Sequence, residues 1–341
     1  MPALLAAASL TSTIHSGESV LIVRPFAAEK DQEKLDFLCK DVWGGQDYLP
    51  SVAKSFENDS TCEFLIMEDE NGKMVAAGNK RKFDDHGTVV WLESIRVSSE
   101  YKGRGIATLL MNELISRSKE SGANEILSCT IGDNHAMKKV FNKVSMDHIN
   151  SIYMLDFGFM RSLKGWSAVS DSDSDPEHIV KALDVEKHIR NDARRVSWSP
   201  VKSERELEEI LYSIKEQGGI GHLPGLFKLL WSSSDLKDSL SKGLIMKKIL
   251  TTPHCVPAVT ALVKDNSIQS LRSKYVCSIA ATDPADVESA LWNLCNDQNI
   301  INEIPAFVIA LDGSILSKNS EFLDALPLQK ENPGVIYSYS P

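Results

Sequence analysis

Hydrophobic positions in the first half of the chain follow two spacings, one typical of strands and one typical of helices. Alternating or short continuous apolar runs predict strands over residues 20–25, 62–68, 73–83, 89–97, 125–130 and 151–159. Helical spacing predicts helices over residues 29–42, around 55–58, from 106 through 114 and over 134–144. Asn71-Gly72 is a strong signal for a two-residue hairpin turn between two of the strands. The predicted order is strand–helix–helix–strand–strand–strand–helix–strand–helix–strand.

The second half of the chain resembles a faded copy of the first. Residues 23–50 contain a strand ending in proline, a helix, and a Gly-Gly segment that leads to Leu-Pro. Residues 198–224 contain the same features in the same order, with nearly the same spacing between the prolines. A strand over 275–280 and a helix over 284–295 follow, with no glycine at their junction. We therefore expect a second domain of the same origin, without the glycine turn of the first.

Composition changes abruptly near Ser167, where polar and acidic residues replace the apolar pattern. The run Ser170–Asp175 has no apolar face, which is typical of a solvated linker. We therefore expect four segments: a disordered N-terminal tail (1–18), a first domain (19–164), an acidic Ser/Asp linker (165–195) and a second domain (196–341).

Overall composition restricts the class of protein. Hydrophobic residues make up 43% and charged residues 25%, as in ordinary globular proteins. A net charge of −10 gives no electrostatic support to a nucleic-acid role, and no apolar run is long enough to span a membrane. The six cysteines show neither a pairing pattern nor the spacing of metal ligands. We expect a cytoplasmic protein with reduced thiols and no bound metal.

The most informative segment is the turn Lys102–Ala107, which joins a predicted strand to a predicted helix. Its two glycines allow bare backbone N–H groups to approach a phosphate, and the helix that follows adds the positive end of its dipole. Lys102 and Arg104 contribute formal charge. A dinucleotide site would use similar parts, but it calls for a small residue where Thr108 stands and for an acidic residue after the next strand, which is absent.

The turn and its surroundings resemble motif A of the GNAT (Gcn5-related N-acetyltransferase) superfamily, whose pattern is Gln/Arg-x-x-Gly-x-Gly/Ala. Lys102, Gly105 and Ala107 fill these positions, with lysine in place of the usual Gln or Arg. Asn134 matches an asparagine that the family carries on the cofactor side. Phe141 stands seven residues later, where the family has a tyrosine that acts as general acid.

This resemblance implies an α/β (α+β) mixed sheet of the GNAT fold, followed here by a degenerate GNAT-like domain. It also implies that acetyl-CoA is the co-substrate, with its pyrophosphate on the turn. The residues expected to hold it are Lys102, Gly103, Arg104, Gly105, Ile106, Ala107 and Asn134. In the family the preceding strand pairs with the pantetheine arm through its backbone, and by position those groups belong to Ile95, Arg96 and Val97.

Three residues outside the turn are candidates for the chemistry. Glu93 is the best candidate for a general base acting through water, since strand alternation places it on the same face as Ile95; an ordinary cross-strand ion pair is the alternative. Tyr48 could replace the missing acid. Asp47 and Tyr48 could also bind an acceptor's cationic group, whereas a helix cap is the alternative for Asp47.

Residues 44–50, the following hairpin and the strand around Glu93 together resemble the histidine N-acetyltransferase family. The expected function is acetyl transfer to the amine of a free amino acid or similar small amine, with histidine the first compound to test. The alternatives are a protein Nα- or lysine-acetyltransferase and a non-catalytic module that binds acetyl-CoA.

Overall fold

The computed structural model describes residues 11–16, 19–45, 47–83, 86–155, 196–219, 221–224, 231–250, 257–264, 275–296, 308–318, 320 and 333–340. The chain forms two compact units. The first comprises Met1–Thr130, Asn134–His148 and Tyr337–Pro341, and the second comprises Ile131–Asp133 and Ile149–Ile336. The expected linker at 165–195 lies outside the described residues.

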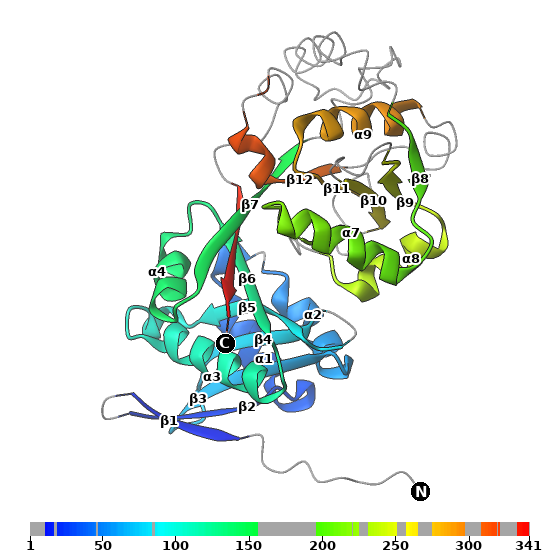
Figure 1. Ribbon diagram of the computed structural model, residues 1–341. Helices are drawn as coiled ribbons and strands as arrows, with labels where there is room; N and C mark the ends of the chain where they lie inside the picture. Colours follow the sequence, from blue (N-terminus) through cyan, green and yellow to red (C-terminus); the bar gives the residue numbers. More distant parts are fainter. Residues whose placement is uncertain are drawn as a thin grey trace, which may run out of the picture. The chain divides into compact units, whose positions relative to one another are not determined.

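A mixed sheet forms the centre of the first unit (Figure 1). Its strands lie in the order β1 (Ser12–Ser16), β2 (Ser19–Pro25), β3 (Cys62–Asp69), β4 (Met74–Lys82), β5 (Val89–Val97) and β6 (Glu125–Ile131). Neighbours from β1 to β5 are antiparallel, and β5 and β6 are parallel. The expectation of a disordered tail over 1–18 is wrong for Ser12–Ser16, because this segment pairs with β2 from Ser12↔Val23 to Ser16↔Ser19.

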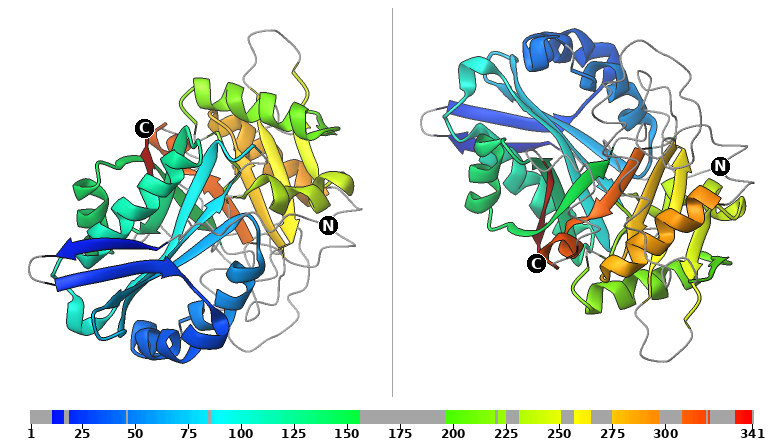
Figure 2. Two further views of the ribbon diagram at one scale, coloured as in Figure 1. Left: turned by 90° about the horizontal axis from the view of Figure 1, so that it is seen from below. Right: turned by 90° about the horizontal axis from the view of Figure 1, so that it is seen from above.

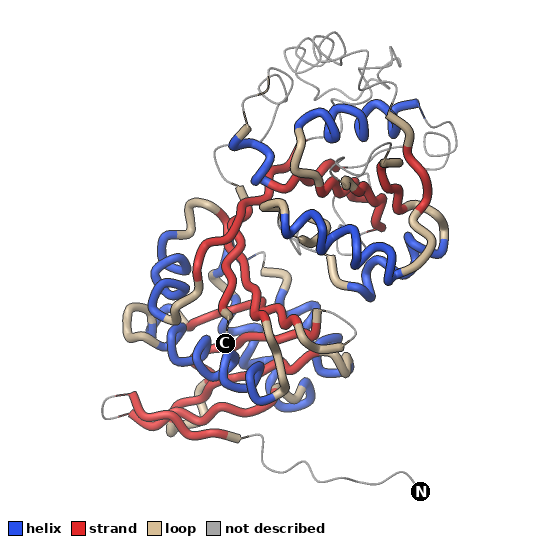
Figure 3. Tube along the Cα trace, in the orientation of Figure 1, coloured by secondary structure: helices blue, strands red, loops and turns tan. Residues whose placement is uncertain are grey.

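The described residues of the first unit form four α-helices, drawn in blue beside the red strands in Figure 3. They are α1 (Ala28–Cys39), α2 (Leu49–Asn58), α3 (Ile106–Glu120) and α4 (His135–Lys143), with short 3-10 turns at Val42–Gly45 and Ser99–Tyr101. The second helix begins earlier than the sequence predicts, because Pro50 lies in its first turn. Backbone N–H groups in that turn have no partner within the helix, so a proline there costs no hydrogen bond.

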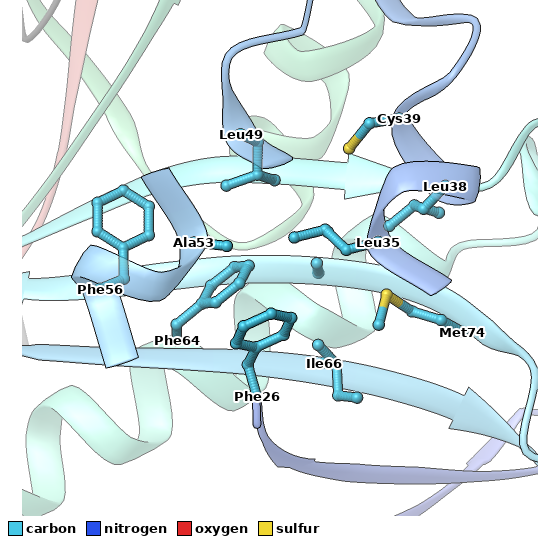
Figure 4. Close-up of a cluster of buried hydrophobic side chains, with 11 residues drawn as sticks. Phe26, Leu35, Leu38, Cys39, Leu49, Ala53, Phe56, Phe64, Ile66 and Met74 are labelled. Carbon is cyan, nitrogen blue, oxygen red and sulfur yellow. The ribbon is translucent and has the colours of Figure 1, made fainter. Parts of the chain in front are cut away.

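Helices α1 and α2 pack on one face of this sheet (Figure 4). Their side chains share a core with β3, β4 and the residue after β2, made by Phe26, Leu35, Leu38, Cys39, Leu49, Ala53, Phe56, Phe64, Ile66, Met74 and Ala77. Helix α3 covers the opposite face, since a Cβ added at Gly78 would meet Ile95, Leu110 and Leu114 at 2.7 to 3.2 Å. Gly78 therefore allows α3 to approach the sheet closely.

The second unit contains β8 (Trp198–Pro200), α7 (Glu204–Glu216), α8 (Ser233–Ser241), β9 (Ile245–Lys248), β10 (Val259–Lys264), β11 (Tyr275–Ala280), α9 (Pro284–Asn296) and β12 (Val308–Asp312) (Figure 2). Strands β8 to β11 are antiparallel, and β11 is parallel to β12 across α9. The first unit has the same relationship between β5 and β6 across α3. This unit repeats the element order of the first, as the faded sequence repeat predicts for a degenerate GNAT-like domain.

Two strands do not belong to the unit that the expected domain ranges 19–164 and 196–341 would give them. Most of β7 (Asp147–Leu155) belongs to the second unit, where Ile152–Leu155 pair antiparallel with β12. The end of β13 (Gly334–Tyr339) belongs to the first unit, where the Tyr337 ring stacks on Phe141. Each unit is therefore completed by a strand from the other part of the sequence.

Candidate active site

Strands β5 and β6 separate halfway along their length. Their parallel pairing runs from Val89↔Glu125 to Leu92↔Ser128, whereas β5 continues to Val97 and β6 to Ile131. A bulge accompanies the separation, because the register between β4 and β5 shifts between Ala77 and Asn79. Ser94 lies opposite this shift with φ of 59°, a left-handed conformation that is unusual for a residue with a side chain. The result is a wedge between the two strands.

Residues Ile95–Val97 lie on the wedge side of β5, beyond the last pair with β6. On its other edge this segment stays in the sheet, since Arg96 and Val97 are in register with Ala77 and Ala76. This edge of β5 is not paired with β6 beyond Leu92, an arrangement that strand addition by an extended chain can use; the Ile95 carbonyl already accepts from Arg96 Nη1 at 3.1 Å. The three residues expected to pair with a pantetheine arm lie in this stretch.

The turn after β5 opens the N-terminus of α3. Gly103 and Gly105 have φ of 77° and 80°, and no side chain caps the helix that Gly105 begins. The N–H groups of Lys102 and Arg104 donate to Ser99 and Tyr101 carbonyls, each at 3.4 Å. The backbone hydrogen bonds of the described residues include none from Gly103 or Gly105. A Cβ added at either glycine would meet nothing within 4 Å, so the turn leaves open space for an anion.

Both cations of the turn are exposed, and one of them is held over a ring. The guanidinium carbon of Arg104 lies 5.2 Å from the ring centroid of Tyr101. The Tyr101 hydroxyl donates to Oδ2 of Asp69 at 2.7 Å, which ties the turn to the end of β3. Nothing in the sequence pattern points to Tyr101 and Asp69, because only the fold brings these two segments together.

Glu93 is held firmly on one side of its carboxylate. Its Oε1 accepts from Asn79 at 2.8 Å and from Arg81 at 2.9 and 3.1 Å. The cross-strand ion pair considered as the alternative is thus present. Its Oε2 accepts nothing from the described part of the chain and is not a buried unpaired atom, so it can meet solvent.

The prediction that Glu93 and Ile95 share a strand face is wrong. Glu93 pairs with Asn79, whereas the Ile95 side chain lies on the α3 side, next to where a Cβ of Gly78 would stand. Residues 78 and 79 of β4 point to opposite faces, as successive strand residues do. The left-handed backbone at Ser94 inserts an extra residue and breaks the alternation of β5.

Tyr48 reaches the bulge from the connection between α1 and α2. Its hydroxyl lies 3.0 Å from Ser94 Oγ, and the residue is 45% exposed. Removal of the hydroxyl from water raises the pKa of Tyr48 above its ordinary value, although the Ser94 hydrogen bond and the Arg96 charge oppose this. On β6, burial and the nearby Glu93 charge raise the pKa of Cys129 to about 12. Both groups therefore keep their protons at neutral pH.

Asp47 does not present a free carboxylate to an acceptor. Its side chain is 1% exposed, and its two oxygens accept from Arg96 at 2.6 and 2.8 Å. Oδ1 also accepts the Leu49 N–H at the start of α2. Burial alone would raise the pKa of Asp47, but hydrogen bonds and charge from Arg96 hold it below its usual range. The expected contact with a substrate cation is corrected to an ion pair within the protein.

Helix α4 carries the remaining family positions. Asn134 caps the helix by accepting from the Met137 N–H at 3.1 Å. Phe141 is fully buried and stacks on Tyr337, with ring centroids 4.4 Å apart. The position at which the family carries its acid is therefore an apolar contact in this chain.

The equivalent strand–helix junction of the second unit is built differently. Strands β10 and β11 stay in register along six residue pairs, without a bulge. Helix α9 begins at Pro284, which has no backbone N–H. The backbone N–H of Ala285 donates to the Asp283 carboxylate. The carboxylate occupies the place where an anion would bind, so this junction offers no counterpart to the Gly103–Gly105 turn.

The described ranges contain neither a metal cluster nor a membrane-spanning helix. No three His, Cys, Asp or Glu side chains gather there in a way that could hold a metal ion. None of the helices in those ranges combines the length and apolar character needed to cross a membrane.

Comparison with known proteins identifies the first unit. Residues 31–146 match the family model "Acetyltransferase (GNAT) family". Two curated relatives, named histidine N-acetyltransferase, come from Oreochromis niloticus and Scomber australasicus; they are 32% and 29% identical over 85 residues, 25% of each chain. The match thus spans about a quarter of the length of these relatives.

Several solved structures match nearly the whole chain, and two of them have a TM-score above 0.5. A GCN5-related N-acetyltransferase from Sphaerobacter thermophilus is 10% identical with a TM-score of 0.52, covering 94% of this chain and 95% of that one. A GCN5-related glucosamine N-acetyltransferase region in a fungal multi-domain GH3 β-N-acetylglucosaminidase is 12% identical with a TM-score of 0.53, covering 94% of this chain and 38% of that one. At such identities the likeness concerns the fold alone. Together with the wedge and the open glycine turn, the family match shows that residues 31–146 form a domain of the GNAT acetyltransferase family.

Proposed function

We propose that this protein transfers an acetyl group from acetyl-CoA to the amine of a free amino acid or similar small amine. The observation that carries the proposal is the pairing of two features, the wedge between β5 and β6 and the uncapped glycine turn at the end of β5. A wedge can take an extended pantetheine arm, and the turn can take a pyrophosphate, in the order in which acetyl-CoA presents them.

The residues of the turn divide the work of holding the co-substrate. Gly103, Gly105, Ile106 and Ala107 would present backbone N–H groups to the pyrophosphate, and Lys102 and Arg104 would add charge. Ile95–Val97 would pair with the pantetheine arm. Asn134, at the start of α4, is proposed as a further cofactor contact because it matches the family position.

In the proposed reaction the amine nitrogen forms a bond to the acetyl carbonyl carbon, and the bond between that carbon and sulfur breaks. Glu93 Oε2 takes the amine's proton through a water molecule, while Arg81 and Asn79 hold Oε1 in place. Tyr48 gives its proton to the departing sulfur. The raised pKa of Cys129 disfavours a thiolate nucleophile, which favours direct transfer to the amine over transfer through this cysteine.

Histidine is the first acceptor to test, and the support comes from the names of the curated relatives. The alternative of a non-catalytic acetyl-CoA-binding module has one observation in its favour, the buried Phe141 at the family's acid position. A cytoplasmic location, where cysteine thiols are usually kept reduced, is part of the proposal.

The decisive experiment incubates the protein with acetyl-CoA and a panel of acceptors, and follows the release of free thiol. The panel should contain the amino acids with histidine among them, simple polyamines, peptide N-termini and a lysine peptide. We expect release with one or a few free amino acids. Release only with peptides would favour protein acetylation, and tight coenzyme binding without release from any acceptor would refute the enzymatic proposal.

A further inference from the structure

Ser94 has an unusual backbone conformation, and its hydroxyl contacts Tyr48. Among the described residues only Ser94 and Ser145 adopt positive φ without being glycine, at 59° and 58°. A left-handed residue with a Cβ carries strain, which glycine would avoid. Strained residues of this kind cluster in active sites and ligand-binding sites. Ser94 is 8% exposed, and its hydroxyl lies 3.0 Å from the Tyr48 hydroxyl.

Tyr48 needs orientation because almost half of the residue is exposed. Its ring lies 5.6 Å from the guanidinium carbon of Arg96, which is itself fixed by two hydrogen bonds to Asp47. This contact places the ring, and the Ser94 contact places the hydroxyl. Two contacts at opposite ends of a side chain define its direction better than either alone.

We propose that Ser94 is a positioning residue that directs the Tyr48 phenol into the wedge between β5 and β6, and that this hydroxyl is why serine rather than glycine stands at the bulge. The inference rests on the proposed function, in which Tyr48 donates the proton to the departing sulfur. Ser94 itself transfers no proton in this scheme. It acts by keeping the phenol within reach of the reacting sulfur.

Ser94→Gly separates the hydroxyl from the backbone conformation, because glycine accepts the same φ without strain. We expect a midpoint of thermal unfolding that is unchanged or raised, with kcat lowered about 10- to 100-fold by misplacement of the phenol. The KM for acetyl-CoA should stay within about twofold, since the turn is untouched. Ser145→Gly is the matched control, because it relieves the same strain in the turn after α4 and should leave kcat unchanged.

A double-mutant cycle tests whether the two hydroxyls act together. Tyr48→Phe should lower kcat at least as much as Ser94→Gly, and the double variant should be no slower than Tyr48→Phe within about twofold. Multiplicative losses would overturn the inference. So would a Ser94→Gly enzyme with kcat close to that of the wild type, or an equal loss in Ser145→Gly.

A second measurement does not depend on finding an acceptor. NMR titration of tyrosines labelled at Cζ, with the Tyr48 signal assigned from Tyr48→Phe, reports the phenol's pKa. Loss of the Ser94 hydrogen bond should move that pKa upward, because the bond favours the phenolate. An upward shift without acetyl transfer would uphold the contact while refuting the proposed function. An unchanged pKa would refute the contact itself.

Discussion

Arg96 donates from Nε and Nη2 to the two carboxylate oxygens of Asp47, and that carboxylate is 1% exposed. The pair links β5 beyond its bulge to the connection between α1 and α2. Paired planar groups of this kind fix orientation as well as distance. The position of Tyr48 at the wedge therefore depends on an ion pair between two side chains of the protein.

Asp47→Asn should destabilise the protein by about 3 kcal/mol, because it leaves the guanidinium of Arg96 in a mostly buried site without its counter-charge. Urea unfolding followed by circular dichroism measures this. Asp238→Asn is the control, since its partner Lys242 and Asp238 are both more than half exposed and the expected change is below about 1 kcal/mol. A higher acceptor KM with unchanged stability would instead restore a substrate-binding role for Asp47.

Gly105→Val should weaken coenzyme A binding roughly 10- to 100-fold for each charge-assisted hydrogen bond that the new side chain prevents. Gly122 at the other end of α3 is a matched control, with φ of 87° and the same open surroundings. Gly122→Val should carry a similar conformational cost while leaving binding intact. Isothermal titration with coenzyme A compares the two, and equal affinities would contradict the proposed phosphate site.

Glu93→Gln should lower kcat at neutral pH by about 100-fold or more, as expected for the loss of a general base, and by less at high pH, where the amine is already unprotonated. Thiol release between pH 6 and 10 gives the profile. Glu63→Gln provides the comparison, since Glu63 is also paired with cations, Lys80 and Arg117, but lies on β3. A uniform loss across the pH range would make Glu93 a structural partner of Arg81 only.

The sequence was sufficient to predict the parts of the site that depend on local order. The turn Lys102–Ala107, the helix after it and the strand before it are consecutive in the chain, and all three are found. The order of the remaining elements followed from apolar spacing in the same way. Even the faded repeat could be read, because prolines and glycines mark element ends.

The features that the sequence could not predict depend on strand register and on contacts between residues far apart in the chain. The bulge at Ser94 leaves no mark in the apolar pattern, so simple strand alternation wrongly places Glu93 and Ile95 on one face. Asp47 looked available because its partner Arg96 lies 49 residues away in the chain. Similarly, the polar residues of β1 do not predict a strand by themselves, because β1 is ordered by its backbone pairing with β2.

Acid should weaken the first unit through Arg24 and its two carboxylates. Asp31 is fully buried; burial would raise its pKa, but Arg24 holds it below the ordinary value, and the same holds for Glu68. Carboxylates with lowered pKa contribute stability above their unfolded pKa of about 4 and lose it as pH falls through the folded value. The urea midpoint should therefore fall less between pH 7 and pH 3 in Asp31→Asn than in the wild type. Asp36→Asn, on the exposed side of the same helix, should behave as the wild type.

Tyr101 should affect the co-substrate more than the chemistry. Its ring lies under Arg104 and its hydroxyl donates to Asp69, so it places a cation that the sequence alone leaves undirected. Tyr101→Phe keeps the ring and loses the tie, whereas Tyr101→Ala loses both. The KM for acetyl-CoA should rise from wild type to Tyr101→Phe and again to Tyr101→Ala. The value of kcat should stay within about twofold, because the binding that is lost is the same in the ground state and the transition state. Arg104→Ala should abolish the difference between the two Tyr101 variants. If instead kcat falls while KM stays constant, Tyr101 supports the fold of the turn and not the binding of the pyrophosphate.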